Sequence, residues 1–177
     1  MNNVNFFKKA LAKVNKISSV CELGSNIGLN LLALKKIYKE DLKKVFSVEI
    51  NKKASRIQKN NIKDITVLNS SINMFDTIKK FDLVLCKGIL IHLNPKDLLK
   101  TYKKMNKLSR KYVLIAEYFN PSPVKISYRG YKNKLFKRDF AKEYLKVNRN
   151  SKLLDYGFIY EKDKFPQDNI NWFLIKK

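Results

Sequence analysis

Two acidic side chains and two glycines stand where predicted buried strands end. In the segment VCELGSNIG, Glu22 and Gly24 close a short apolar run, and Gly28 precedes a helical pattern. Gly24 permits a tight turn with unusual dihedral angles, and Gly28 allows the helix to start close to the strand. Glu49 closes the next apolar run, where a carboxylate can accept hydrogen bonds from both hydroxyls of a ribose. The spacing therefore predicts a nucleoside-binding turn at one edge of a sheet.

The charge of this turn indicates the kind of nucleoside. The glycine spacing is G-x-x-x-G, whereas loops that bind a pyrophosphate carry three glycines in the pattern G-x-G-x-x-G. An acidic residue directly before this turn is a poor neighbour for a pyrophosphate, but it suits a ligand with an ammonium and a sulfonium. Glu22 and Glu49 together predict S-adenosylmethionine, with Ser25 and Asn26 in the same turn as further contacts.

The end of the fourth predicted strand carries two more candidates. Lys87 closes this strand, and His92, the single histidine of the chain, follows it. The ordinary pKa of histidine lies near neutral pH, so His92 is a candidate general base; the alternative is a histidine packed at a helix start. Lys87 is a candidate for lining the donor pocket or contacting an anionic acceptor, and a solvated lysine is the alternative.

The segment from Tyr118 to Asp139 is long, aromatic and basic, and it contains two of the five arginines. Arginine matches carboxylate or phosphate groups through paired donors. We therefore predict that this segment recognises an anionic acceptor, while a loop that merely covers the sheet edge is the alternative. Tyr118 joins His92 as a candidate catalytic residue, and the predicted acceptor contacts are Tyr128, Arg129, Lys137 and Arg138.

The elements that position these residues alternate between apolar runs and amphipathic stretches. Five strands separated by helices predict a parallel, doubly wound sheet, and two final strands joined by a short loop predict an antiparallel hairpin. The predicted strands are 18–23, 45–50, 65–70, 81–89, 111–119, 153–161 and 169–177, and the predicted helices are 1–16, 27–39, 51–61, 73–80, 95–108 and 138–147. Residues 120–137, with two prolines and a glycine, are predicted to be irregular.

The composition limits the functional classes. The net charge of +23 would attract any polyanion, but 33 of the 38 basic residues are lysines spread along the chain, as an AT-rich genome would also produce. Nucleic-acid binding therefore stays a minor alternative. Both cysteines lie in predicted buried strands, which favours a reducing cytoplasm, and no metal-ligand spacing is present. No apolar run approaches the ~20 residues of a membrane span, and no signal peptide is evident.

The motif ELGSNIG resembles motif I of class I S-adenosylmethionine-dependent methyltransferases. The segments KGILIHLNP (87–95), 117–145 and 155–177 further resemble the methyltransferases associated with pseudaminic acid biosynthesis in bacteria. This resemblance spans roughly residues 15–177. It implies a Rossmann-like fold, S-adenosylmethionine as methyl donor, S-adenosylhomocysteine as product, and a genetic association with nonulosonic acid pathways. It also implies that Ser71 and Ile72, after the third strand, contact adenine.

The sequence thus predicts a single methyltransferase domain over residues 1–177, with residues 119–150 as an insertion on the acceptor side. The expected acceptor is a small molecule or glycan, and an anionic sugar fits best. Two alternatives stay open. One is an RNA methyltransferase, supported by the charge, and the other is a non-catalytic cofactor-binding partner of sugar-modifying enzymes. The sequence indicates neither the acceptor atom nor the oligomeric state.

Overall fold

The computed structural model describes the backbone of residues 2–128 and 131–177, and the side chains of 2–127 and 135–177. Seven strands form one sheet in the order β3-β2-β1-β4-β5-β9-β8, in which β1 to β5 are parallel and β9 is antiparallel to both neighbours. The strands are β1 (Ser19–Leu23), β2 (Lys44–Val48), β3 (Ile65–Leu68), β4 (Phe81–Lys87), β5 (Ser109–Glu117), β8 (Lys152–Ile159) and β9 (Ile170–Lys176). This confirms the predicted fold class.

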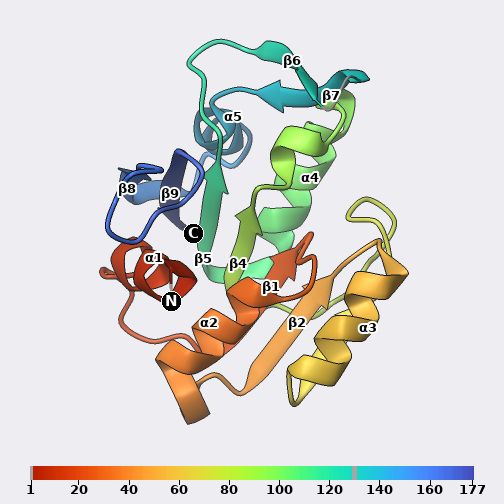
Figure 1. Cartoon of the computed structure of the whole chain (residues 1–177), viewed down its shortest axis with the longest axis vertical. Coiled ribbons are helices and arrows are strands. Elements are labelled where there is room, and N and C mark those ends of the chain that lie inside the picture. The colour runs from red at the N-terminus through yellow and green to blue at the C-terminus, as the bar shows by residue number, and fades with distance from the viewer. Residues whose placement is uncertain (1, 129–130) are drawn as a thin grey trace.

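Helices cover both faces of the sheet (Figure 1). One apolar cluster packs α1 and α2 against the sheet, and a second packs α4 and α5 against the other face. In β4, Leu83 and Leu85 belong to the first cluster and Val84 and Cys86 to the second, as the two-residue period of a strand requires. The helices are α1 (Asn2–Ala10), α2 (Leu29–Tyr38), α3 (Lys52–Asn61), α4 (Pro95–Leu108) and α5 (Phe140–Val147), with short 3₁₀ helices η1 (Lys39–Asp41) and η2 (Leu90–His92).

Helix boundaries follow capping chemistry where it is present. The Asn94 side chain accepts a hydrogen bond from the Lys96 N–H, and Pro95 occupies the first turn, so α4 matches its predicted range. The predicted first helix is too long, because α1 ends at Ala10. Leu11 and Val14 still pack into the core beyond its end. No described helix is long and apolar enough to cross a membrane.

The helix predicted over residues 73–80 is wrong. This segment lies in turns, a bend and irregular backbone between β3 and β4. The Asp76 carboxylate accepts a hydrogen bond from the Thr77 N–H at 2.9 Å, and the Thr77 hydroxyl accepts one from the Lys79 N–H at 3.1 Å. Such local side-chain bonds to the backbone compete with helix formation. Residues 73–80 therefore contribute no helix to the layers that cover the sheet.

The prediction that residues 120–137 are irregular is also wrong. Strands β6 (Val124–Tyr128) and β7 (Tyr131–Lys137) pair antiparallel as a separate two-stranded sheet. Pro121 and Pro123 precede β6 and therefore interrupt no ladder hydrogen bond. Figure 1 shows this hairpin beyond the ends of β4 and β5, at the edge of the sheet that carries the predicted site.

Candidate functional site

The turn between β1 and α2 has the geometry for which its glycines are needed. Gly24 and Gly28 adopt φ of +74° and +84°, in the left-handed region. A Cβ atom on Gly24 would collide with the Ile89 side chain, and one on Gly28 would come within 2.6 Å of Ile62 Cδ1. The Gly24 N–H donates to the Val48 carbonyl at 2.8 Å, which ties the turn to the end of β2. The predicted roles of both glycines therefore match the backbone.

Glu49 lies directly after β2 with only 8% of its surface exposed. Its Oε2 accepts a hydrogen bond from the Asn26 N–H at 2.7 Å, and its Oε1 accepts one from the Asn51 N–H at 2.8 Å. These two bonds fix the orientation of the carboxylate across the β1–α2 turn. An ionised carboxylate has about four acceptor positions, so capacity for two further donors remains.

Glu22, in β1, is fully buried. The Asn30 Nδ2 donates to its Oε1 at 2.7 Å, while Oε2 has no hydrogen-bond partner among the described residues. Burial raises the pKa of Glu22 to about 8, although the Asn30 bond and the charge of Lys87 oppose the shift. A buried carboxyl oxygen without a partner is costly, and it identifies the place where a cationic group would be stabilised.

Lys87 ends β4 in the same neighbourhood. Burial lowers the pKa of its ammonium, while the carboxylates of Glu22, Asp168 and Glu117 act in the opposite direction. Its Nζ lies 5.5 Å from the centroid of the Phe6 ring in α1. Lys87 is therefore partly buried, between acidic side chains and an aromatic face.

An apolar cavity of about 110 Å³ adjoins the turn. It brings together four of the predicted cofactor residues, whereas Ser25, Asn26 and Gly28 lie in the turn beside it. A carboxylate at the rim of an apolar slot suits a ligand with a flat apolar part and hydroxyl groups. The lining residues are Gly24, Val48, Glu49, Ile50, Ser70, Ser71, Ile72, Ile89 and Leu93.

Two polar side chains that the sequence did not single out hold this turn in place. The Gln58 Nε2, from α3, donates to the Ser25 hydroxyl at 2.9 Å and also to the Asn26 carbonyl. The Asn69 Nδ2 donates to the Glu49 carbonyl at 2.8 Å. Both residues lie more than fifteen positions along the chain from their partners, so no local pattern marks them.

Glu117, at the end of β5, is the third unpredicted residue. Its Oε1 accepts hydrogen bonds from the N–H groups of Ile89 and Leu90, both at 2.8 Å. Burial raises the pKa of Glu117 to about 7, although these backbone donors oppose the shift. Glu117 thereby positions the turn that leads from β4 into η2. His92 is the exposed last residue of η2, next to Leu93, which lines the cavity.

A second hollow of about 480 Å³ lies at the same edge, between the end of β5, β7 and the loop joining β8 to β9. Tyr118 lines it, and the Lys137 Nζ lies 5.3 Å from the centroid of the Tyr118 ring. These two predicted residues are therefore neighbours. The full lining is Tyr118, Phe119, Lys137, Phe158, Glu161, Asp168, Asn169 and Asn171.

Arg138, another predicted acceptor residue, does not line this hollow. The Arg138 Nη1 pairs with the Glu143 Oε1 at 2.9 Å, and the other Glu143 oxygen accepts a hydrogen bond from the Tyr102 hydroxyl at 2.8 Å. Arg138 thus joins β7 to α5 and α4. Tyr128 ends β6, but its side chain and all of Arg129 lie outside the described residues.

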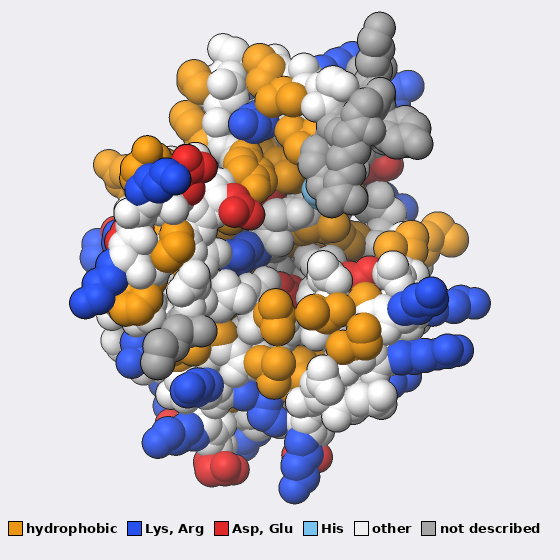
Figure 2. Space-filling view, viewed as in Figure 1, with side chains coloured by type: hydrophobic (Ala, Val, Ile, Leu, Met, Phe, Trp, Pro, Cys, Tyr) orange, Lys and Arg blue, Asp and Glu red, His pale blue; other side chains and the backbone are white. Residues whose placement is uncertain are grey.

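Figure 2 shows this face of the molecule hollowed in the middle, with acidic side chains at the hollow and Lys and Arg around its outline. Glu22, Glu49 and Glu117 are buried there, and Glu161 and Asp168 line the second hollow. This edge therefore gathers five of the 15 acidic residues of a chain that has 38 basic ones. The arrangement can hold a cationic nucleoside beside a polar acceptor.

Solved structures share this fold. A methyltransferase from Clostridium acetobutylicum ATCC 824, described as S-adenosylmethionine-dependent, aligns with a TM-score of 0.74 and 13% identity over 99% of this chain and 90% of that one. The 1,6-didemethyltoxoflavin-N1-methyltransferase of Burkholderia thailandensis aligns with a TM-score of 0.75 and 12% identity over 99% of this chain and 78% of that one. The N-methyltransferase NodS of Bradyrhizobium japonicum WM9 aligns with a TM-score of 0.71 and 12% identity over 99% of this chain and 93% of that one.

At these identities the likeness shows the fold. No family model matches the chain, and no curated protein sequence matches it. The chain has the fold of class I S-adenosylmethionine-dependent methyltransferases.

Proposed function

We propose that this protein binds S-adenosylmethionine at the carboxyl edge of β1 and β2 and transfers its methyl group to a small molecule or glycan. The observation that carries this proposal is the pair Glu22 and Glu49. One has a buried oxygen without a described partner, and the other is a carboxylate fixed by two backbone donors across a glycine turn. A ligand with an ammonium and a ribose satisfies both.

The residues present fit this cofactor. Glu49 would accept hydrogen bonds from the ribose hydroxyls, and Glu22 would face the ammonium. The apolar cavity beside Ser71 and Ile72 would take the adenine. The neighbours give independent support, because the toxoflavin enzyme and the O-methyltransferase from Brevibacillus brevis were solved with S-adenosylhomocysteine. The magnesium protoporphyrin IX methyltransferase from Synechocystis was solved with the methyl donor.

When bound, S-adenosylmethionine supplies a methyl group already activated by a sulfonium, so the protein has mainly to orient and enclose the reactants. Glu117 fixes the turn that carries His92, the candidate base for the proton of a hydroxyl or amine acceptor. Tyr118 and Lys137 line the hollow in which the acceptor would lie. If the acceptor atom is a carboxylate oxygen, no base is required.

The lining of this hollow supports an acceptor that carries both an anionic group and hydroxyls. Lys137 offers a cation to an anionic group, and Asn169 and Asn171 with the two carboxylates offer partners to hydroxyls. An acidic sugar has both kinds of group. The link to pseudaminic or other nonulosonic acid pathways is part of this proposal and rests on the sequence resemblance. We place the reaction in the cytoplasm because the two cysteines are buried and free, which fits a reducing compartment.

The proposal is tested by methyl transfer from radiolabelled S-adenosylmethionine to a fractionated lysate of the source organism. We expect label in a low-mass acidic or glycan fraction, and loss of that label with the variant Glu49→Gln. Label in the RNA fraction alone would replace this proposal with the RNA methyltransferase. Binding of S-adenosylhomocysteine without any labelled fraction would replace it with the non-catalytic module.

A further inference from the structure

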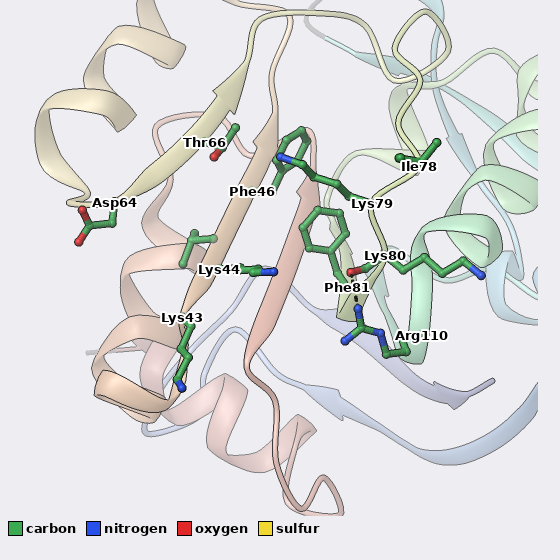
Figure 3. Close-up of a pocket in the computed structure, with 11 residues that line it drawn as sticks. Lys43, Lys44, Phe46, Asp64, Thr66, Ile78, Lys79, Lys80, Phe81 and Arg110 are labelled. Carbon is green, nitrogen blue, oxygen red and sulfur yellow. Dashed lines mark hydrogen bonds between the residues drawn. The ribbon is translucent and has the colours of Figure 1, made fainter.

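A strongly basic hollow, separate from the two cavities described above, lies at the opposite edge of the sheet. It has a volume of about 580 Å³ and is built where β2, β3 and β4 begin (Figure 3). Small-molecule sites have volumes of roughly 300–1,000 Å³, so this hollow is large enough for a metabolite. It is lined by Lys43, Lys44, Val45, Phe46, Asp64, Thr66, Ile78, Lys79, Lys80, Phe81 and Arg110.

The hollow exists because no helix covers this part of the sheet. The segment between β3 and β4 lies in turns, a bend and irregular backbone, and Ile78 on that segment is 96% exposed. Beneath it, the rings of Phe46 and Phe81 lie with their centroids 5.4 Å apart and form an aromatic floor. Figure 3 shows both rings facing the hollow, between Thr66 on one side and Arg110 on the other.

The cations of the hollow are available to a ligand. None of the four lysines that line it forms an ion pair with a carboxylate of the described residues. The Lys79 Nζ lies 6.0 Å from the centroid of the Phe46 ring, and the Lys44 ammonium points toward Phe81 in Figure 3. Asp64, the single acidic lining residue, stands at the margin.

Arg110 is held in position rather than free. Its Nη1 lies 3.6 Å from the Asp82 Oδ1, and its Nη2 donates to the Lys80 carbonyl at 3.3 Å. The Asp82 carboxylate also pairs with Lys111 at 3.3 Å, so it does not neutralise Arg110 alone. A guanidinium fixed at the rim of a basic hollow is suited to a phosphate, which it can bind through paired donors.

We infer that this hollow binds a nucleoside phosphate. Its phosphates would lie among Lys44, Lys79 and Arg110, and its base or ribose would contact the aromatic floor and the Thr66 hydroxyl. This site is distinct from the carboxyl edge, because its residues precede or begin β2, β3, β4 and β5, whereas Glu49, Lys87 and Glu117 lie at the opposite ends of β2, β4 and β5. A nucleoside phosphate fits better than a bare anion, which would contact only the cations. It also fits better than a long polyanion, which would bind the lysines without contacting the aromatic floor.

The test is calorimetric titration of the whole protein with UDP, with pyrophosphate and with uridine. We expect UDP to bind at least ~tenfold more tightly than either fragment, since its two parts contact different walls of the hollow. Equal binding of UDP and pyrophosphate would overturn the nucleoside part of the inference, and no UDP binding would overturn all of it. Binding of an oligo(U) strand without binding of UDP would show a nucleic-acid surface instead.

Matched variants separate the hollow from the general charge of the protein. Lys44→Gln with Lys79→Gln should weaken UDP binding by at least ~tenfold, because charge-assisted hydrogen bonds to phosphate are lost. Lys162→Gln with Lys164→Gln removes the same charge from the loop between β8 and β9 and should change UDP binding less than ~twofold. Equal losses in both pairs would mean that only the net charge attracts the ligand. Circular dichroism confirms folding, and S-adenosylhomocysteine titration of the wild type tests the proposed function separately.

Discussion

Acidic side chains are buried at one edge of the sheet, and exposed basic side chains surround a hollow at the other. At the carboxyl edge, Glu22, Glu49 and Glu117 are buried, and each has at least one oxygen bound to a specified donor. At the amino edge, exposed lysines surround a hollow and form no ion pairs with described carboxylates. Burial makes the acidic positions specific, since a buried carboxylate is retained only where donors or cations compensate for it.

This difference shows that the net charge of +23 says little about the main site. The field of the whole chain would favour anions, whereas the edge that carries the glycine turn contains several buried acidic side chains. The number of exposed lysines follows the overall composition, and an exposed lysine can be replaced with little effect on the fold. A buried carboxylate beside a glycine of positive φ needs specific hydrogen-bond donors or cations around it. The following predictions test whether the two edges really differ in this way.

The largest effect is expected at the turn itself. Gly24→Ala adds a methyl group that collides with Ile89 at a φ of +74°. Strain of this kind costs on the order of 1–3 kcal/mol, and we expect loss of measurable S-adenosylhomocysteine binding along with a lower free energy of unfolding. Calorimetry and urea denaturation measure the two effects.

Gly88→Ala provides the control, because Gly88 has a φ of +68° but no atom within 4 Å of the added Cβ. It should show the backbone strain without the collision. If both variants lost the same stability, the close approach of Ile89 would have no consequence for the turn.

The next largest effect is expected at Glu49. Glu49→Gln places an amide NH₂ against a backbone N–H, so one of the bonds that orient the side chain is lost. A lost hydrogen bond to a charged group costs about 1.5–3 kcal/mol, and we expect S-adenosylhomocysteine affinity to fall accordingly in calorimetry. Glu40→Gln, an exposed acid in η1, should leave the affinity unchanged. A similar loss in both variants would assign the effect to net charge.

A smaller effect concerns pH. Burial raises the pKa of Glu22 from 4.5 to about 8, so the folded protein holds a proton that the unfolded chain has released. The stability contributed by this group is complete below pH 4.5 and declines as pH rises toward 8, at most by about 1.4 kcal/mol per pH unit. Denaturation across this range should show a shallower decline for Glu22→Gln. The same pH dependence of the unfolding free energy in both proteins would contradict the raised pKa of Glu22.

The smallest effect is expected for lysines that line neither the basic hollow nor the cavities at the carboxyl edge. Lys59→Gln with Lys63→Gln removes two positive charges near the start of β3. Exposed substitutions usually change stability by no more than about 0.5 kcal/mol, and the S-adenosylhomocysteine affinity should stay within ~twofold. A tenfold change in calorimetry would mean that the field of the whole molecule acts on the carboxyl edge.

The sequence predicted most of the framework of this edge. The apolar runs indicated all seven strands of the large sheet, and Glu22, Gly24 and Glu49 were identified from their position at strand ends. The start of α4 was recovered because Pro95 marks the first turn of a helix, and the structure adds the Asn94 cap. These features depend on residues that are close together in the chain.

The remaining features depend on contacts distant in sequence or on weak local patterns. Gln58, Asn69 and Glu117 act on backbone atoms that lie twenty or more positions away in the chain. The segment 73–80 has an amphipathic pattern, yet side-chain bonds from Asp76 and Thr77 replace the helix. The hairpin of β6 and β7 was missed because its flanking prolines indicate irregular backbone, although they precede the strand.

The most direct test of the carboxyl edge is calorimetric titration of the wild-type protein with S-adenosylhomocysteine above pH 8, where Glu22 is ionised. We predict saturable binding of one molecule per chain, with release of protons when the titration is repeated near neutral pH, and a raised melting temperature. A folded protein that gives no binding heat and no change in melting temperature would contradict the assignment of this edge as the cofactor site.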